Sequence, residues 1–263
     1  MTKHYFAVCA YRESPYLEAC LSSLKMQKGR CNVIVCTSTP NEHIMGLCVK
    51  YGFPLYVREG EPSLRDDWNF AAETAEALGA SLLTIAHQDD RYAPEYSERV
   101  TKYFEFGAIN MVVTRCDNID EHGRKFTGKA ERVKRFLRWP LSVWALSSTM
   151  WGKMHALKYG NAIPCPGVTY NLDLLELPIF DNDYRFVIDW EAFRKIAELP
   201  GQIVACEEPL VEIRLHKDSE TVNTMNNDLR YKEELEMFKS FHSEGVAKFI
   251  ARFYKGAGKN YGR

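Results

Sequence analysis

The chain has 263 residues and a formal net charge of −1, with 34 basic residues against 35 acidic residues. A chain of this length buries roughly three-quarters of the surface that it exposes when unfolded, which is enough for one large core. The balanced charge excludes a global basic field that would attract nucleic acid, so we expect no nucleic-acid partner.

The cysteines and the N-terminus indicate a cytoplasmic protein. The eight cysteines have no paired CxxC spacing, and several fall inside apolar segments, which is typical of reduced thiols. The opening MTKHYFAVCAYRES lacks an apolar run of signal-peptide length, and nowhere do about 18 apolar residues follow one another. We therefore expect neither export nor a transmembrane segment.

Apolar runs alternate with amphipathic segments over the first 90 residues. The expected strands are 5–10, 32–38, 54–59 and 81–86, and the expected helices are 15–26, 41–51 and 64–78. Ser14 before Pro15 predicts a capped helix start. The inner side of the third helix would carry Trp68, Ala71, Ala72, Ala75 and Leu78. Such alternation is typical of a parallel α/β sheet that is covered on both faces.

The remaining pattern is weaker. It predicts a strand at 109–120, a loop and a strand within 160–176, a helix at 189–199, a strand at 202–216 and one or two helices within 226–254. We accordingly divide the chain into a domain at 1–225, with halves at 1–117 and 118–225, and a C-terminal helical extension at 226–263.

Three polar clusters follow three of the predicted strands. They are YRES at 11–14, TST at 37–39 and HQDD at 87–90. Ligands of open α/β sheets bind beyond the carboxyl ends of the strands, where these clusters would meet. Asp89 and Asp90 could hold a hard divalent cation, which prefers oxygen ligands and keeps positions open for phosphates. Alternatively, the pair caps a turn.

Two further residues have both a functional and a structural interpretation. His216 follows the last predicted strand, where it could ligate the same metal or be a hydrogen-bonded structural histidine. Asp189 lies at a predicted helix start, where it could act as a base or be a plain N-cap.

The order of these pieces resembles the inverting family 2 glycosyltransferases, which have the GT-A fold. The pieces are YFAVCAYRESPYLEACLSSL, PSLRDDWNFAAETA, LLTIAHQDDRYAP, GNAIPCPGVTY, VIDWEAFRKIAEL and EIRLHKDSET. The resemblance covers about residues 4–225. It implies a GT-A-like, mostly parallel α/β sheet with helices on both faces, followed by C-terminal helices.

The resemblance also implies roles for individual residues. The nucleotide of a nucleotide-sugar donor would contact Tyr11, Glu13, Thr37, Arg65, Asn69, His87 and Asp89. Asp89, Asp90 and His216 would hold Mg²⁺ or Mn²⁺, and Asp189 would be the catalytic base. The metal would meet the charge that collects on the departing diphosphate, and one direct displacement would invert the anomeric carbon.

The chain departs from the family pattern at two places. His87 stands where many members carry an aspartate two positions before the metal-binding one, and CTSTP replaces a segment that often contains an aspartate after the second strand. Two other functions remain open: a non-catalytic nucleotide- or sugar-binding module, and a nucleotidyltransferase. The latter usually needs a glycine-rich phosphate loop, and CAYRESPY contains no glycine.

Residues 129–151 combine basic side chains with three tryptophans. The segment is either a solvated, partly core-facing helix pair or a peripheral membrane contact. In the second case Lys129, Arg132, Lys134, Arg135 and Arg138 would face anionic headgroups, while Phe136, Leu137, Trp139 and Trp144 enter the interface. A membrane contact would suit a lipid-linked glycan acceptor in surface glycan or polysaccharide synthesis.

Overall fold

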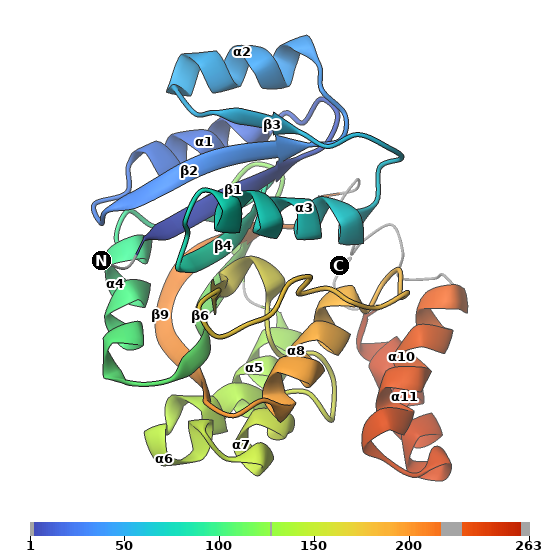
Figure 1. Ribbon diagram of the computed structural model, residues 1–263. Helices are drawn as coiled ribbons and strands as arrows, with labels where there is room; N and C mark the ends of the chain where they lie inside the picture. The colour runs from blue at the N-terminus through green and yellow to red at the C-terminus, as the bar shows by residue number, and fades with distance from the viewer. Residues whose placement is uncertain (1–2, 127, 217–227, 259–263) are drawn as a thin grey trace.

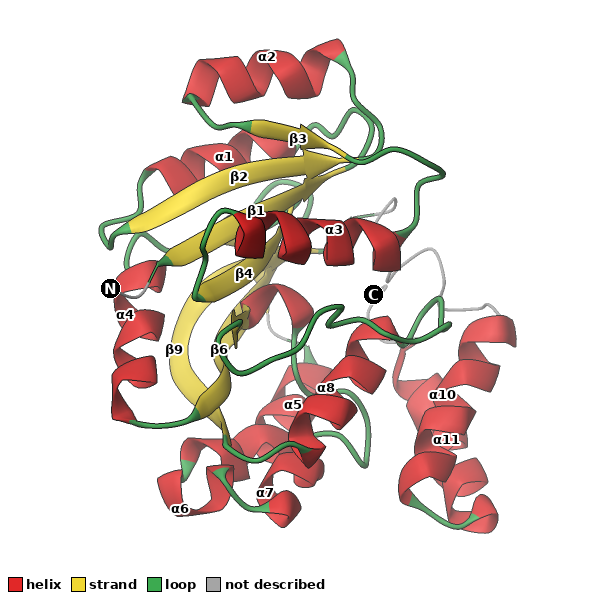
Figure 2. Ribbon diagram, viewed as in Figure 1, coloured by secondary structure: helices red, strands yellow, loops and turns green. Residues whose placement is uncertain are grey.

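The computed structural model describes residues 3–126, 128–216 and 228–258. Among these residues one mixed sheet forms the centre of the molecule, with strands in the order β3-β2-β1-β4-β8-β6-β9-β5 and with β7 paired to β6 (Figures 1 and 2). The α/β prediction is confirmed. The predicted boundary at 225 lies outside the described residues.

The first half contains the predicted parallel strands and their connecting helices. They are β1 (His4–Ala10), α1 (Leu17–Lys25), β2 (Cys31–Thr37), α2 (Glu42–Tyr51), β3 (Leu55–Val57), α3 (Leu64–Ala77) and β4 (Leu82–His87). Along β1, Ala7 faces the core under α3, whereas Phe6 and Val8 face the core under α1 and α2. Both faces of the strand are buried, which explains its unbroken apolar sequence.

Two local predictions in this half were wrong. The first helix begins at Leu17 without a side-chain cap, and the Ser14 hydroxyl instead accepts the Tyr16 N–H at 3.3 Å and donates to Asp89 across the sheet edge. Leu78 was expected on the inner side of the third helix, but it is the C-cap of α3 and is 37% exposed. Helical periodicity alone does not reveal either tertiary effect.

The second half joins the same sheet. It contributes β5 (Arg91–Tyr92), α4 (Tyr96–Tyr103), β6 (Ile109–Ile119), β7 (Lys125–Phe126), β8 (Val168–Asn171) and β9 (Gln202–Arg214). β9 runs parallel to β6, whereas β8 lies antiparallel between β4 and β6. The proposed division at 117 therefore falls inside β6, and the sheet is continuous across it.

Most remaining helices lie below the sheet in Figure 1. They are α5 (Lys129–Arg138), α6 (Trp144–Ser147), α7 (Met150–His155) and α8 (Ile188–Glu198), with the hairpin of α10 (Asp228–Phe241) and α11 (Glu244–Gly258) beside them. Short 3-10 turns span Phe104–Phe106, Trp139–Ser142 and Cys165–Gly167. No helix in the described ranges is long and apolar enough to span a bilayer.

Two residues of α5 face inward, as in the core-facing alternative and not as the membrane-contact alternative required. Leu137 is 9% exposed and Arg138 only 1%. Arg138 Nη1 donates to the Ala162 carbonyl at 2.9 Å, so this guanidinium stabilises the loop before β8 rather than facing solvent. A basic residue in a helix is usually exposed. Arg138 is buried because the loop before β8 lies over it and accepts its hydrogen bond.

A buried polar network connects β1, β4, β8 and α4. His4 Nε2 hydrogen-bonds to Thr84 Oγ1 at 2.9 Å, and Thr84 Oγ1 to Thr169 Oγ1 at 2.8 Å. His4 Nδ1 bonds to Ser97, and the Tyr96 hydroxyl bonds to Thr169. Burial lowers the pKa of His4 to about 3, so the imidazole is neutral and uses one nitrogen as donor and the other as acceptor.

We predict that Thr84→Val destabilises the protein by about 1–3 kcal/mol, because a buried ring nitrogen of His4 loses its partner while the volume stays the same. Denaturant unfolding followed by circular dichroism measures the change. Thr101→Val is the control. The Thr101 hydroxyl donates only within its own helix, to the Ser97 carbonyl, and the residue is partly exposed. Equal stability of the two variants would contradict a stabilising role for the network.

Candidate active site

The loops after β1, β2 and β4 are fastened to one another at the carboxyl edge of the sheet. Tyr11 N donates to Gln88 Oε1 at 2.9 Å, and Gln88 Nε2 donates to the Tyr11 carbonyl at 3.1 Å. On the other side, Arg12 N donates to Thr39 Oγ1 at 2.6 Å. Arg12 has φ of 53°, a left-handed conformation that costs energy for a residue with a side chain and that these bonds compensate. Sequence reasoning missed the role of Gln88.

Asp89 meets His216 at this edge, although 127 positions separate them in the chain. The Asp89 Oδ2 and His216 Nε2 atoms are 3.0 Å apart, and Ser14 Oγ donates to Asp89 Oδ1 at 3.0 Å. The Tyr16 ring lies against the His216 ring, with centroids 4.8 Å apart. Two of the three predicted metal ligands are thus in hydrogen-bond contact with each other, and each is held by a further neighbour.

The spacing of this pair fits a hard divalent cation. Two ligand atoms about 2.1 Å from one octahedral ion and at right angles to each other are about 3 Å apart. No group of three or more His, Cys, Asp or Glu side chains that could hold a metal occurs in the described part of the chain. An ion held by Asp89 and His216 would therefore take its other ligands from phosphate oxygens and water.

Asp90 has a different environment from Asp89. Its side chain is 3% exposed, and Oδ1 accepts the backbone N–H of Arg214 at 2.9 Å. Burial raises the pKa of Asp90 to about 8, against the effect of the Arg214 N–H, which stabilises the carboxylate. This placement favours a role for Asp90 in joining β9 to the turn after β4, with the metal contact left to Asp89.

His87 carries a neutral imidazole. Burial lowers its pKa to about 4, although the charge of Asp89 raises it. The ring stacks on Trp68 with centroids 5.4 Å apart, and its Nδ1 lies 3.9 Å from Asp90 Oδ2. Its Nε2 has no hydrogen-bond partner among the described residues. A buried polar atom of this kind is typical of a site that awaits a ligand.

The other predicted donor residues divide into two groups. Tyr11 and Glu13 are exposed at the edge, whereas Thr37 is buried and its hydroxyl accepts the Thr39 N–H at 3.0 Å. Asn69 exchanges two hydrogen bonds with the Phe180 backbone, and Arg65 pairs with Asp183 at 2.9 Å. These last two residues therefore connect α3 to the loop that precedes α8.

Asp189 lies in the first turn of α8, but the N-cap is Val187, which makes no side-chain cap. Asp189 Oδ2 accepts Asn161 Nδ2 at 3.0 Å, and Oδ1 accepts the Trp190 N–H at 2.8 Å. Burial raises the pKa of Asp189 to about 6, against those two bonds and the charge of Lys134. A carboxyl group with this pKa can accept a proton near neutral pH.

Asp189 and Asp90 share a neighbour. Burial raises the pKa of the Cys165 thiol well above its ordinary value, and the charges of Asp189 and Asp90 both raise it further. Cys165 therefore lies within electrostatic range of both carboxyl groups.

No family model matches the sequence, and no curated protein matches it either. Solved structures do share the fold. A mannosyltransferase from Pyrobaculum calidifontis in complex with GDP-Man and Mn²⁺ aligns with a TM-score of 0.63 and 14% identity, over 97% of this chain and 72% of that one. S. aureus TarS 1–349 in complex with UDP-GlcNAc aligns with a TM-score of 0.62 and 15% identity, over 95% and 70%.

A third structure, the glucosyl-3-phosphoglycerate synthase of Mycobacterium tuberculosis in complex with UDP, aligns with a TM-score of 0.52 and 11% identity, over 92% of this chain and 82% of that one. The chain has the GT-A fold. The identities are too low to establish more than the fold, which confirms the architecture that the sequence resemblance implied.

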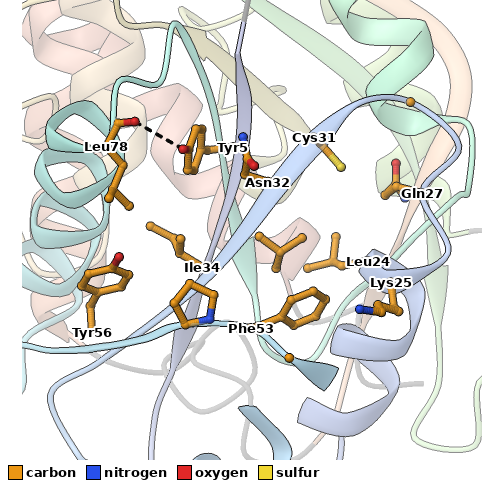
Figure 3. A pocket seen from close by; sticks show the side chains of 14 residues that line it. Tyr5, Leu24, Lys25, Gln27, Cys31, Asn32, Ile34, Phe53, Tyr56 and Leu78 are labelled. Carbon is orange, nitrogen blue, oxygen red and sulfur yellow. Dashed lines mark hydrogen bonds between the residues drawn. The ribbon is translucent and has the colours of Figure 1, made fainter. Parts of the chain in front are cut away.

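A cavity of about 500 Å³ lies at the opposite edge of this GT-A sheet, where β1, β2 and β3 begin (Figure 3). Tyr5, Ile34, Phe53 and Tyr56 line it, and the Tyr5 hydroxyl donates to the Leu78 carbonyl at 3.3 Å. Its lining contains no carboxylate or histidine. We therefore assign the candidate site to the carboxyl edge, where parallel sheets bind ligands.

The C-terminal hairpin supports the helix that carries Asp189. The Glu233 carboxylate of α10 accepts the backbone N–H groups of Arg185 at 3.0 Å and Phe186 at 2.7 Å, directly before α8. The Trp190 ring packs edge-on against Phe238, with centroids 5.1 Å apart. Sequence reasoning missed Glu233, because a glutamate within an amphipathic helix carries no motif.

We predict that Glu233→Gln increases amide exchange of residues 185–190, because the N–H groups of the loop lose a charged acceptor. A loss of about 1–3 kcal/mol corresponds to roughly 5- to 150-fold faster local exchange. Hydrogen–deuterium exchange measures it. The control is Glu234→Gln, which removes an equally buried carboxylate that pairs with Arg230 on the same helix. Indistinguishable exchange in the two variants would exclude a specific role for Glu233.

Proposed function

We propose that the protein is an inverting glycosyltransferase that moves a sugar from a nucleotide diphosphate sugar to a hydroxyl acceptor. The observation that carries this proposal is the contact between Asp89 and His216 at the carboxyl edge of a GT-A sheet. The structural neighbours named above are bound to nucleotides or nucleotide sugars, which supports the donor class.

The donor would bind across the loops after β1, β2 and β4. Tyr11 and Glu13 are available at the exposed edge, and the neutral His87 has a ring nitrogen that can bond to a donor hydroxyl or base. Thr37 would support the loop from beneath, and Arg65 and Asn69 would hold the segment that separates the donor from the acceptor.

Asp89 and His216 would hold the divalent ion, with Asp90 as their support. When bound, Mg²⁺ or Mn²⁺ would neutralise the charge that develops on the departing diphosphate. The imidazole makes Mn²⁺ the better match, because it is a softer ligand than a carboxylate. Ser14 and Tyr16 keep the two ligand side chains in place.

Asp189 would accept the proton of the acceptor hydroxyl. As the hydroxyl oxygen forms its bond to the anomeric carbon, the bond from that carbon to the diphosphate breaks, and the proton passes to Asp189. One displacement inverts the anomeric configuration. Asn161 orients the carboxylate, and Lys134 stabilises its charged form.

The acceptor that we propose is a glycan or a lipid-linked glycan, in surface glycan or polysaccharide synthesis at the cytoplasmic face of a membrane. The chemistry of the site requires a hydroxyl nucleophile, and the segment at 129–151 adjoins the site through Lys134. A peripheral position would bring a lipid-linked acceptor to the side of α5.

We predict that Asp89→Asn and Asp90→Asn have different effects on nucleotide binding. Asp89→Asn should weaken Mn²⁺-dependent binding of the cognate diphosphate at least about tenfold, because it removes a direct metal ligand. Asp90→Asn should change binding much less, because an amide oxygen still accepts the Arg214 N–H. Calorimetric titration with UDP, GDP and dTDP, each with and without Mn²⁺, measures the difference.

Circular dichroism controls for folding of both variants. If no diphosphate binds the folded wild-type protein with Mn²⁺, the donor assignment fails. If one binds but no sugar is transferred or hydrolysed, the protein is a binding module rather than an enzyme.

We predict that kcat/KM rises with pH through about 6, because Asp189 must lose its proton to act as a base. Asp189→Asn should lower the rate about 10²- to 10⁴-fold and abolish this inflection. Asn161→Leu should move the inflection to higher pH, because it removes a hydrogen bond that stabilises the carboxylate. A flat profile between pH 5 and 7, or a fully active Asp189→Asn variant, would assign the base elsewhere.

A further inference from the structure

Residues 129–159 differ in charge from the rest of the chain. The segment contains seven basic residues and one acidic residue, a formal charge of +6, in a chain whose net charge is −1. It also contains three of the five tryptophans, at 139, 144 and 151, and all three are about half exposed. The other two, Trp68 and Trp190, are buried.

We call the exposed aromatic side chains of this segment the aromatic face. They are Phe136, Trp139, Trp144, Trp151 and Tyr159, which are 43% to 70% exposed. Three of them gather around the His155 ring, with centroids 6.3 Å away for Phe136, 5.2 Å for Trp151 and 6.1 Å for Tyr159. The elements that carry the face, α5 to α7, lie together at the base of the molecule in Figure 1.

Trp144 extends the face toward the end of α4. Together with Tyr103 and Phe106 it lines a shallow pocket of about 480 Å³, and Phe106 is 69% exposed. Scattered single apolar residues are normal on a protein surface, whereas a cluster of large ones such as Phe136, Trp151 and Tyr159 marks an interaction site.

Helix α5 separates the aromatic face from the candidate site. Leu137 and Arg138 are buried on its inner side, and the charge of Lys134 reaches Asp189. Arg132, Arg135 and Phe136 are exposed on its outer side. Residues at helical spacing thus divide the helix into an inner face that supports the site and an exposed outer face, where Arg135 pairs with Glu207 at 3.8 Å and Phe136 contacts the His155 ring.

We propose that the aromatic face docks onto the surface of a bilayer that contains anionic lipids. The exposed basic residues beside it match anionic headgroups, and tryptophan and tyrosine prefer the interface between water and hydrocarbon. Val133 and Met150, 57% and 50% exposed, add aliphatic groups that a bilayer would bury but that a platform for sugars would not need. This inference rests on the surface and not on the proposed function.

Vesicle sedimentation without nucleotide tests the proposal. The full chain should co-sediment with phosphatidylcholine vesicles that contain one-third phosphatidylglycerol, and high salt or pure phosphatidylcholine should weaken this binding. Arg132→Glu/Arg135→Glu should reduce the affinity at least about 25-fold, because each basic residue near an anionic surface contributes about fivefold. Phe136→Ser/Trp151→Ser should also release the protein from the vesicles.

Two matched controls lie on other elements. Lys28→Glu/Lys50→Glu makes the same change in net charge, and Met45→Ser/Val49→Ser removes exposed apolar side chains from α2, at the top of Figure 1. Both should bind vesicles like the wild-type protein. Equal losses in the charge control and the Arg132/Arg135 variant would indicate unspecific attraction and overturn the proposal.

Two other results would also overturn it. One is a folded wild-type protein that binds neither kind of vesicle. The other is self-association in light scattering that Phe136→Ser/Trp151→Ser abolishes, in the absence of vesicle binding, because the aromatic face would then join copies of the chain. The vesicle assay contains no nucleotide, so its outcome is independent of whether the proposed glycosyltransferase function is correct.

Discussion

The candidate site depends on the way Arg214 fastens the end of β9 to the turn after β4. Its backbone N–H donates to the buried Asp90 carboxyl group at 2.9 Å, and its Nε donates to the Asp89 carbonyl at 3.1 Å. Nη1 donates to the carbonyls of Asp120 and Glu121, and the guanidinium lies 4.5 Å from the centre of the Tyr16 ring. A buried arginine needs hydrogen-bond acceptors, and here three backbone carbonyls from two segments accept its side-chain N–H groups. Because Arg214 is held in this way, His216, two residues later, reaches Asp89.

A similar division between support and chemistry occurs around Asp189. Helix α8 is held on one side by the loop that Asn69 and Arg65 bind, and on the other side by Glu233 and the packing of Phe238 on Trp190. The C-terminal hairpin therefore belongs to the core and is not an appendage. Its Met237 and Phe238 are buried in the same cluster as α3 and α8. These contacts hold Asp189 in a defined position, which the proposed base would need in order to transfer a proton efficiently.

Helix α5 places two environments within a few residues of each other. Its inner side carries Lys134, which acts on the charge of Asp189, and Arg138, which binds the loop before β8. Its outer side carries exposed arginines and Phe136. If both proposals hold, the outer side of α5 rests on a bilayer and the proposed base lies near the inner side of the same helix.

The sequence by itself determined the alternation of buried strands and amphipathic helices and the polar clusters that end those strands, because these are local patterns of residue type and spacing. It also singled out Asp89, Asp189 and His216 as candidate site residues. Only the tertiary structure decided which of two adjacent aspartates contacts His216. Asp89 and Asp90 are the same residue type, and they differ because Arg214, on a distant strand, binds the side chain of Asp90. The tertiary structure also decided that β8 is antiparallel, that Arg138 is buried and that Glu233 supports α8. Strand direction, burial of a charge and the partner of a carboxylate all depend on segments far away in the chain, which no local pattern encodes.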